Sequence, residues 1–238
     1  MTEHETMARI LIVLTSHATL GNTGKATGFY FEELAVPYWA FRDAGHSVDL
    51  ASIAGGKPPH DPESLKENHE AVTRFLADKD AAASLSRTLP IEAAKAGAYD
   101  AVFLPGGHGT MWDLPGNTAL ARVIGAIFDA GGAVGAVCHG PAGLIDAKGA
   151  DGLPIVRGRR VNGFTDSEEK ASGLGGTVPF LLETRLRETG AKFEGGADFQ
   201  PYAVRDGMLV TGQNPASSAN VAALMLDILK ERSSVRAA

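Results

Sequence analysis

Short apolar runs alternate with longer helical segments along the chain. The runs lie at 10–14, 48–51, 101–104 and 133–137, and runs of this kind are typical of strands buried on both faces of a sheet. Helical segments at 29–44 and 118–130 end at glycines, Gly45 and Gly131, which suit the left-handed stop of a helix. This alternation predicts an α/β fold with a mostly parallel sheet covered by helices on both faces.

The pattern is weaker in the rest of the chain. Residues 205–207 favour a hairpin turn, and an amphipathic helix is predicted from 216 to about 230. The range 58–98 is charged and rich in alanine, which predicts two surface helices inserted there. Because no linker or break in composition divides the chain, we expect a single domain over 1–238 with a surface insertion at about 58–98.

Charge and cysteine content exclude several classes of protein. The net charge is −6 with acidic and basic residues interspersed, so no basic patch indicates a nucleic-acid or membrane partner. One cysteine cannot form an internal disulfide. No apolar run has the length of a membrane span, and the polar start MTEHETMAR lacks the apolar core of a secretory signal. We therefore expect a cytoplasmic protein.

The single cysteine, Cys138, directly follows the apolar run 133–137. Small residues, Ala136 and Gly140, flank it and permit a sharp strand-to-helix turn like a nucleophile elbow, although glycine is usual at the first position. At the amino terminus of the helix GPAGL the thiol is expected to have a lowered pKa, with the His139 N–H as an oxyanion donor. The alternative is a buried structural cysteine.

Two further segments are expected at the same edge of the sheet. The loop after 101–104 contains Gly106, Gly107 and His108, and its N–H groups would help to bind an oxyanion or the substrate. A plain strand-exit turn is the alternative. Glu33 begins the helix after the first strand, and if it points over the strand ends, burial would raise its pKa and let it donate a hydrogen bond to the thiolate.

The positions of the histidines restrict the chemistry. Residues 17, 60, 69 and 108 have no metal-ligand spacing and no second cysteine beside them, so we predict no metal and solvated or capping roles. A glutamine amidotransferase needs a histidine late in the chain, whereas every histidine here lies at or before 139. Any histidine that assists Cys138 is therefore His139 or a loop histidine such as His108.

Five segments together resemble one family across nearly the whole chain, in the same order. They are GFYFEELAVPYWAFRDAGHSVDLAS, LPGGHGTMWD, AVCHGPAGL, VNGFTDSEEK and LVTGQNPAS. They resemble the PfpI/ThiJ superfamily, in its branch of heat-shock chaperone-like, glutathione-independent glyoxalases. The resemblance implies a flavodoxin-like three-layer sandwich, a homodimer and a Cys-His-acid triad. That triad would be Cys138, His139 and Glu169. The neighbouring Glu168 is the alternative for the acid, one position earlier in the sequence.

The resemblance also implies the chemistry. Glu33 would be the protonated partner of the thiolate, and Gly107 the oxyanion glycine. Cys138 would convert methylglyoxal and related 2-oxoaldehydes to lactate through a hemithioacetal, without a cofactor. Some relatives bind zinc through other histidines, which we do not match here.

Three other functions are consistent with the same residues. A deglycase would repair glycation adducts with the same cysteine. In a stress holdase or redox sensor, Cys138 would be oxidised to sulfinic acid, and Glu33 would be the hydrogen-bond partner of this group. A peptidase would need an open cleft, whereas we expect the range 58–98 to cover a small pocket.

Overall fold

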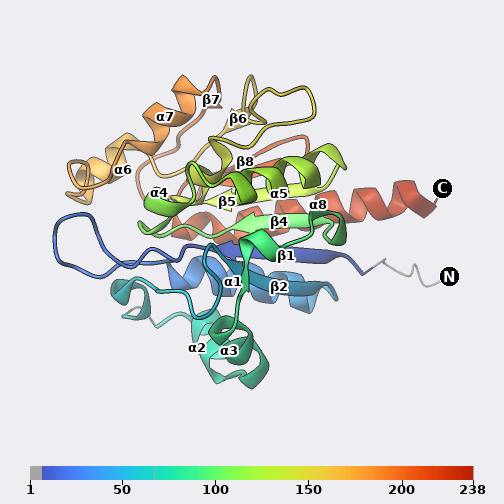
Figure 1. Cartoon of the computed structure of the whole chain (residues 1–238), viewed down its shortest axis with the longest axis horizontal. Helices are drawn as coiled ribbons and strands as arrows, with labels where there is room; N and C mark the ends of the chain where they lie inside the picture. The colour runs from blue at the N-terminus through green and yellow to red at the C-terminus, as the bar shows by residue number, and fades with distance from the viewer. Residues whose placement is uncertain (1–6, 67, 238) are drawn as a thin grey trace.

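The computed structural model describes residues 7–66 and 68–237, and the α/β architecture is confirmed. The central sheet contains β1 (Arg9–Leu14), β2 (Ser47–Ser52), β3 (Leu89–Pro90), β4 (Ala101–Leu104), β5 (Ala133–Val137), β8 (Ala203–Asp206) and β9 (Leu209–Gly212). Its strand order is β3-β2-β1-β4-β5-β9-β8, and Figure 1 labels β2, β1, β4, β5 and β8 of this series. Every neighbouring pair is parallel except β8 with β9, which form the predicted hairpin.

Helices cover both faces of this sheet. Helices α1 (Phe31–Asp43) and α8 (Ser218–Ala237) pack against each other on one face, and α5 (Thr118–Asp129) packs on the other (Figure 1). Consecutive residues of β4 point to opposite faces: the Phe103 ring meets Phe41 of α1 at 6.1 Å between centroids, while Leu104 lies against Gly143. The flavodoxin-like sandwich that the resemblance implied is therefore confirmed.

The two helices expected in the range 58–98 are α2 (Glu70–Ala77) and α3 (Lys79–Ser86). Helix α2 packs on α1, with the rings of Phe75 and Tyr38 at 4.9 Å. The same range also supplies the edge strand β3 and the short 3-10 helices η1 (Pro62–Leu65), η2 (Ile91–Ala93) and η3 (Ala96–Ala98). The His69 side chain caps α2 by accepting a hydrogen bond from the Ala71 N–H, as expected of a capping histidine.

Several short elements were not predicted. They are α4 (Thr110–Asp113), α6 (Asp166–Ala171), α7 (Leu182–Glu188), the parallel pair β6 (Arg160–Val161) and β7 (Lys192–Phe193), and the 3-10 helix η5 (Pro215–Ser217). The predicted helix GPAGL is present as the 3-10 helix η4 (Gly140–Leu144). Elements of two to seven residues are too short to give a readable period. Within the described part of the chain, the search for an apolar helix of membrane-spanning length finds none.

Candidate active site

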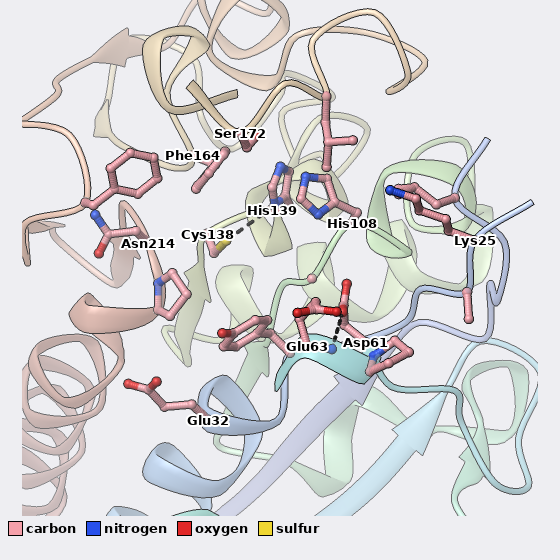
Figure 2. A pocket seen from close by; sticks show the side chains of 18 of the residues that line it. Lys25, Glu32, Asp61, Glu63, His108, Cys138, His139, Phe164, Ser172 and Asn214 are labelled. Carbon is pink, nitrogen blue, oxygen red and sulfur yellow. Dashed lines mark hydrogen bonds between the residues drawn. The ribbon is translucent and has the colours of Figure 1, made fainter. Parts of the chain in front are cut away.

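Three chain segments meet at the carboxyl edge of the sheet. Cys138 follows β5, the loop 105–109 follows β4, and Glu33 lies in the first turn of α1. Since β4 and β5 are parallel neighbours, their carboxyl ends meet at one edge, where α/β folds bind ligands. A cavity of about 830 Å³ opens here, with the sulfur of Cys138 in its wall (Figure 2).

Cys138 has a left-handed backbone, with φ of +59°. This conformation costs a non-glycine residue about 1–3 kcal/mol. Two hydrogen bonds hold it: the Cys138 N–H donates to the Gly212 carbonyl at 2.9 Å, and its own carbonyl accepts from the Phe164 N–H at 2.8 Å. A Cβ at Gly140 would lie 2.1 Å from the Leu104 carbonyl oxygen, so the turn needs glycine there. The sharp strand-to-helix turn predicted from small flanking residues is confirmed.

The sulfur lies among hydrogen-bond donors. His139 Nδ1 is 3.3 Å from Cys138 Sγ, and the backbone N–H groups of Gly107 and His139 point to the sulfur. Gly107 has φ of +94°, and the Tyr30 N–H donates to the Gly106 carbonyl at 3.1 Å. Because that carbonyl points to Tyr30, the N–H on the other side of the same peptide faces the sulfur.

The expectation of a lowered thiol pKa is wrong for the site as it stands. Burial raises the pKa of Cys138, Glu33 raises it further when it is ionised, and the two backbone N–H groups lower it only in part. The helix after Cys138 is also the five-residue 3-10 helix η4 rather than an α-helix, so few peptide dipoles are aligned at the sulfur.

Glu33 is fully buried beside the thiol. Its Oε2 accepts a hydrogen bond from the Gly106 N–H at 2.6 Å, while its Oε1 has no hydrogen-bond partner. Burial raises the pKa of Glu33 to about 8, as expected, so the carboxyl group carries a proton at neutral pH. Protonation removes the negative charge that opposes ionisation of Cys138. The Gly106 N–H is used by Glu33, so the prediction that Gly106 binds an oxyanion is wrong.

His139 connects the thiol to an ionised carboxylate. Its Nε2 lies 2.6 Å from Glu169 Oε2, and His108 Nε2 lies 3.0 Å from Oε1 of the same residue. Burial raises the pKa of Glu169, but the hydrogen bonds and charges of the two imidazoles outweigh it and bring the pKa well below its usual range. We therefore assign the proton of neutral His139 to Nε2, which leaves the Nδ1 lone pair facing the thiol. Burial and the neighbouring His108 lower the pKa of His139.

Glu168 contacts a different set of groups from its neighbour. Its Oε2 accepts from the N–H and hydroxyl of Thr165 in a capping box, at 3.0 and 3.1 Å. Its Oε1 accepts from the Phe199 N–H at 2.7 Å and from the side chains of Gln213 and Asn214 at 3.1 and 2.9 Å. Glu169, not Glu168, is thus the partner of the imidazole. The spacing Thr-x-x-Glu was the sequence signal that could have separated the two.

His108, His139 and Glu169 also form a potential metal-ligand set. Their ligand atoms lie within 4.8 Å of one another, and these three form the group of possible metal ligands found in the described residues. The spacing of the histidines along the chain does not indicate this set, because folding brings it together from β4, β5 and α6. Each member is already hydrogen-bonded to another member.

The remaining walls of the cavity include residues that the sequence did not indicate. Phe164 packs on the His139 ring at 4.5 Å between centroids, and Phe199 lines the cavity nearby. Among the described residues of the range 58–98, Asp61, Pro62 and Glu63 line the cavity and the others do not. The expectation that the range as a whole covers a small pocket is therefore wrong: α2 packs on α1, α3 packs on α2, and the cavity volume is about 830 Å³.

The sequence was also compared with protein families, and the model of the DJ-1/PfpI family matches residues 25–231. This chain belongs to the DJ-1/PfpI family. The match includes all the residues placed at this site. The resemblance of the five sequence segments to the PfpI/ThiJ superfamily is confirmed.

Individual members of the DJ-1/PfpI family are similar over almost their full length. "Glutathione-independent glyoxalase HSP31" of Saccharomyces cerevisiae is 34% identical, over 93% of this chain and 98% of the relative. The crystal structure of glyoxalase III from Candida albicans has a TM-score of 0.86 at 29% identity, with 93% and 97% covered. Rapid Encystment Protein 24 KDa of Francisella tularensis has a TM-score of 0.91 at 37% identity, with 94% and 99% covered.

Proposed function

We propose that this chain is a glutathione-independent glyoxalase that converts methylglyoxal and related 2-oxoaldehydes to 2-hydroxy acids, lactate in the case of methylglyoxal. The observation that carries the proposal is the line of contacts from Cys138 Sγ to His139 Nδ1 at 3.3 Å and from His139 Nε2 to Glu169 at 2.6 Å. It is the arrangement of an activated nucleophile, a base and a group that orients the base. The similar proteins named as glyoxalases support the choice of reaction.

The first step is addition of the thiol to the aldehyde. His139 Nδ1 takes the proton of Cys138, and the charge of the resulting imidazolium is balanced by Glu169 at Nε2. Protonated Glu33 stabilises the thiolate from the other side. The sulfur forms a bond to the aldehyde carbon, and the proton returns from His139 to the new oxygen, which gives a neutral hemithioacetal.

The second step moves a proton between the two carbons. Because Glu33 holds its own proton below pH of about 8, neutral His139 is the better base. It removes the proton from the first carbon and returns it to the second, while the hydroxyl proton passes from the oxygen of the first carbon to that of the second, which gives the thioester. The N–H groups of Gly107 and His139 stabilise the negative charge of the enediolate between these transfers.

In the last step water hydrolyses the thioester and restores the thiol. The aldehyde carbon has been oxidised to a carboxylic acid and the ketone carbon reduced to an alcohol, so the substrate supplies both oxidant and reductant. The net reaction adds one water molecule. We propose on this basis that the enzyme is a lyase of the glyoxalase III type and that turnover requires neither glutathione nor another cofactor.

The test is turnover of methylglyoxal by metal-free, glutathione-free protein. Loss of substrate and formation of lactate are followed for wild type and for Cys138→Ser. We expect the variant to lose about 10⁴-fold in kcat, since serine is far less acidic than cysteine. Leu153→Ala, at a side chain outside the cavity, is the control and should keep wild-type rates. Equal rates in wild type and Cys138→Ser would overturn the proposal.

The alternative functions give different results with the same two proteins. A deglycase would release glycated amino acids at a rate that exceeds its turnover of free methylglyoxal. A holdase would suppress aggregation of a denatured client equally well in wild type and Cys138→Ser. The homodimer and the cytoplasmic location stay predictions, and sedimentation would measure the first.

A further inference from the structure

Phe199 combines features that the proposed mechanism does not use. It is the second non-glycine residue of the described chain with a positive φ, +59°. Its side chain is 50% exposed, although an aromatic ring on the surface loses contact with the core. It also lines the cavity that contains Cys138. A strained, exposed aromatic residue at a cavity is a candidate for ligand contact.

The backbone of Phe199 is held in place by a buried carboxylate. Glu168 is fully buried, and its Oε1 accepts the Phe199 N–H at 2.7 Å. The same oxygen accepts from the side chains of Gln213 and Asn214, and Asn214 in turn donates to the Gln200 carbonyl at 2.8 Å. These bonds connect the loop at 199–200 to the start of η5, so the exposed ring is presented from a fixed backbone.

Phe199 continues an aromatic wall that begins at the triad. The His139 and Phe164 rings lie 4.5 Å apart, and Phe164 meets Phe199 edge to face at 6.2 Å between centroids. The wall therefore extends from the base that contacts Cys138 to a ring that is half exposed. A planar group attached to a molecule bound at the sulfur would lie along it.

The size of the cavity also points beyond methylglyoxal. The volume is about 830 Å³. A three-carbon aldehyde occupies on the order of 100 Å³, the volume of a few water molecules. Asp61 and Glu63 lie across the cavity from the triad (Figure 2). With Glu32 they outnumber Lys25 in the described lining, so a negatively charged substituent is disfavoured and a neutral one fits better.

We propose that this site acts on 2-oxoaldehydes that carry a neutral aromatic substituent, and that Phe199 is the specificity-determining residue that contacts this ring. The inference rests on the proposed glyoxalase function. For phenylglyoxal the reaction is the same as for methylglyoxal: the aldehyde carbon is oxidised, the ketone carbon is reduced, one water is added and mandelate is formed. Contact with Phe199 is present in both substrate and transition state, so it lowers KM more than it raises kcat.

The test compares phenylglyoxal with methylglyoxal as substrates. In wild type we expect a higher kcat/KM for phenylglyoxal. Phe199→Ala should lower that value about tenfold, mainly through KM, and change the value for methylglyoxal less than about twofold. Phe199→Tyr keeps the aromatic ring and should have the wild-type kcat/KM for phenylglyoxal. Leu153→Ala, which removes an exposed apolar side chain away from this cavity, should change neither substrate.

Other outcomes separate this inference from the proposed function. Equal loss for both substrates in Phe199→Ala, or no loss for either, would overturn the role of Phe199. Turnover of methylglyoxal without turnover of phenylglyoxal would overturn the substrate class and leave the glyoxalase function standing. Binding of the products by calorimetry is independent of turnover. Mandelate should bind more tightly than lactate, and Phe199→Ala should remove this difference in affinity. Equal affinity of the two products for wild type would contradict contact between the substrate ring and the aromatic wall.

Discussion

The turn at Cys138 and the loop at Phe199 share a backbone conformation and differ in what holds it. Both residues have φ of +59°. Cys138 is fixed by backbone hydrogen bonds to Gly212 and Phe164, which tie it to the end of the central sheet. Phe199 is fixed by a side chain, Glu168, that reaches it from a helix. The strain at the nucleophile thus belongs to the fold, whereas the strain at the cavity wall depends on one carboxylate.

Two consecutive residues of α6 serve these two regions. Glu169 contacts the imidazoles of His139 and His108, and Glu168 contacts the backbone and amides around Phe199. The glutamate that contacts the imidazoles and the glutamate that fixes the cavity wall are therefore adjacent in the sequence. Substitutions at the two glutamates should separate them in experiments as well.

The largest difference is expected in kcat between Glu169→Gln and Glu168→Gln. A glutamine at 169 offers one acceptor and one donor to two imidazole N–H groups, so the tautomer of His139 is no longer fixed. We expect kcat for methylglyoxal to fall about 10³-fold in Glu169→Gln. Glu168→Gln should stay within about tenfold of wild type. Steady-state lactate formation measures both, and a larger loss at 168 would reverse the assignment of the two glutamates.

Stability should depend more on Glu168 than on Glu169, the opposite of the order expected for kcat. Glu168→Ala removes the acceptor of five hydrogen bonds to buried or half-buried groups. We expect the free energy of unfolding to fall by about 4 kcal/mol, because the donors lose their partner inside the protein. Urea unfolding measures it, with Glu188→Ala at the exposed end of α7 as control. A loss below about 1 kcal/mol would show that water replaces the carboxylate.

Stability should also depend on pH through Glu33. Its native pKa of about 8 lies above the ordinary value of 4.5, so the native state keeps a proton that the unfolded chain releases between these pH values. The free energy of unfolding therefore falls as pH rises through this range. Glu33→Gln lacks this loss and should be about 3 kcal/mol more stable than wild type at pH 7, with the advantage disappearing near pH 4.5. Urea unfolding at several pH values would contradict this if the two curves stayed parallel.

The same proton should limit catalysis at high pH. When Glu33 ionises above pH of about 8, its charge opposes the Cys138 thiolate, so kcat/KM for methylglyoxal should decline there. Glu33→Gln cannot ionise and should show a flatter alkaline limb with a lower plateau. A pH profile of the two proteins distinguishes them, and an identical decline in both would assign it to another group.

The smallest expected effect tests the shared strain. Glycine adopts a positive φ without cost, so glycine should be more stable than alanine by about 1 kcal/mol at position 138 and at position 199. Thermal unfolding of Cys138→Gly against Cys138→Ala, and of Phe199→Gly against Phe199→Ala, measures each difference. If glycine and alanine at position 199 give equal stability, the loop backbone relaxes in solution. Position 199 would then not share the backbone strain of the turn at Cys138.

Periodicity and residue type were sufficient for the central layer and for the turn at Cys138, whereas the pairing of His139 with Glu169 was implied only by the family resemblance. The runs at 10–14, 101–104 and 133–137 became strands because apolar residues at every position can be buried only inside a covered sheet. The small residues around Cys138 indicated the sharp turn. The sequence offered Glu33 as a partner of the thiol on the condition that it points over the strand ends, and the structure places it there, with Oε2 on the Gly106 N–H.

The tertiary structure alone decided the direction of the Cys138 pKa and the wall formed by Phe164 and Phe199. These depend on burial and on contacts between residues far apart in the chain. Local pattern carries no information on either. A sequence determines which turns and faces are available through steric and apolar preferences that act over a few residues. Charge, dielectric environment and cavity size arise only when distant segments are packed together.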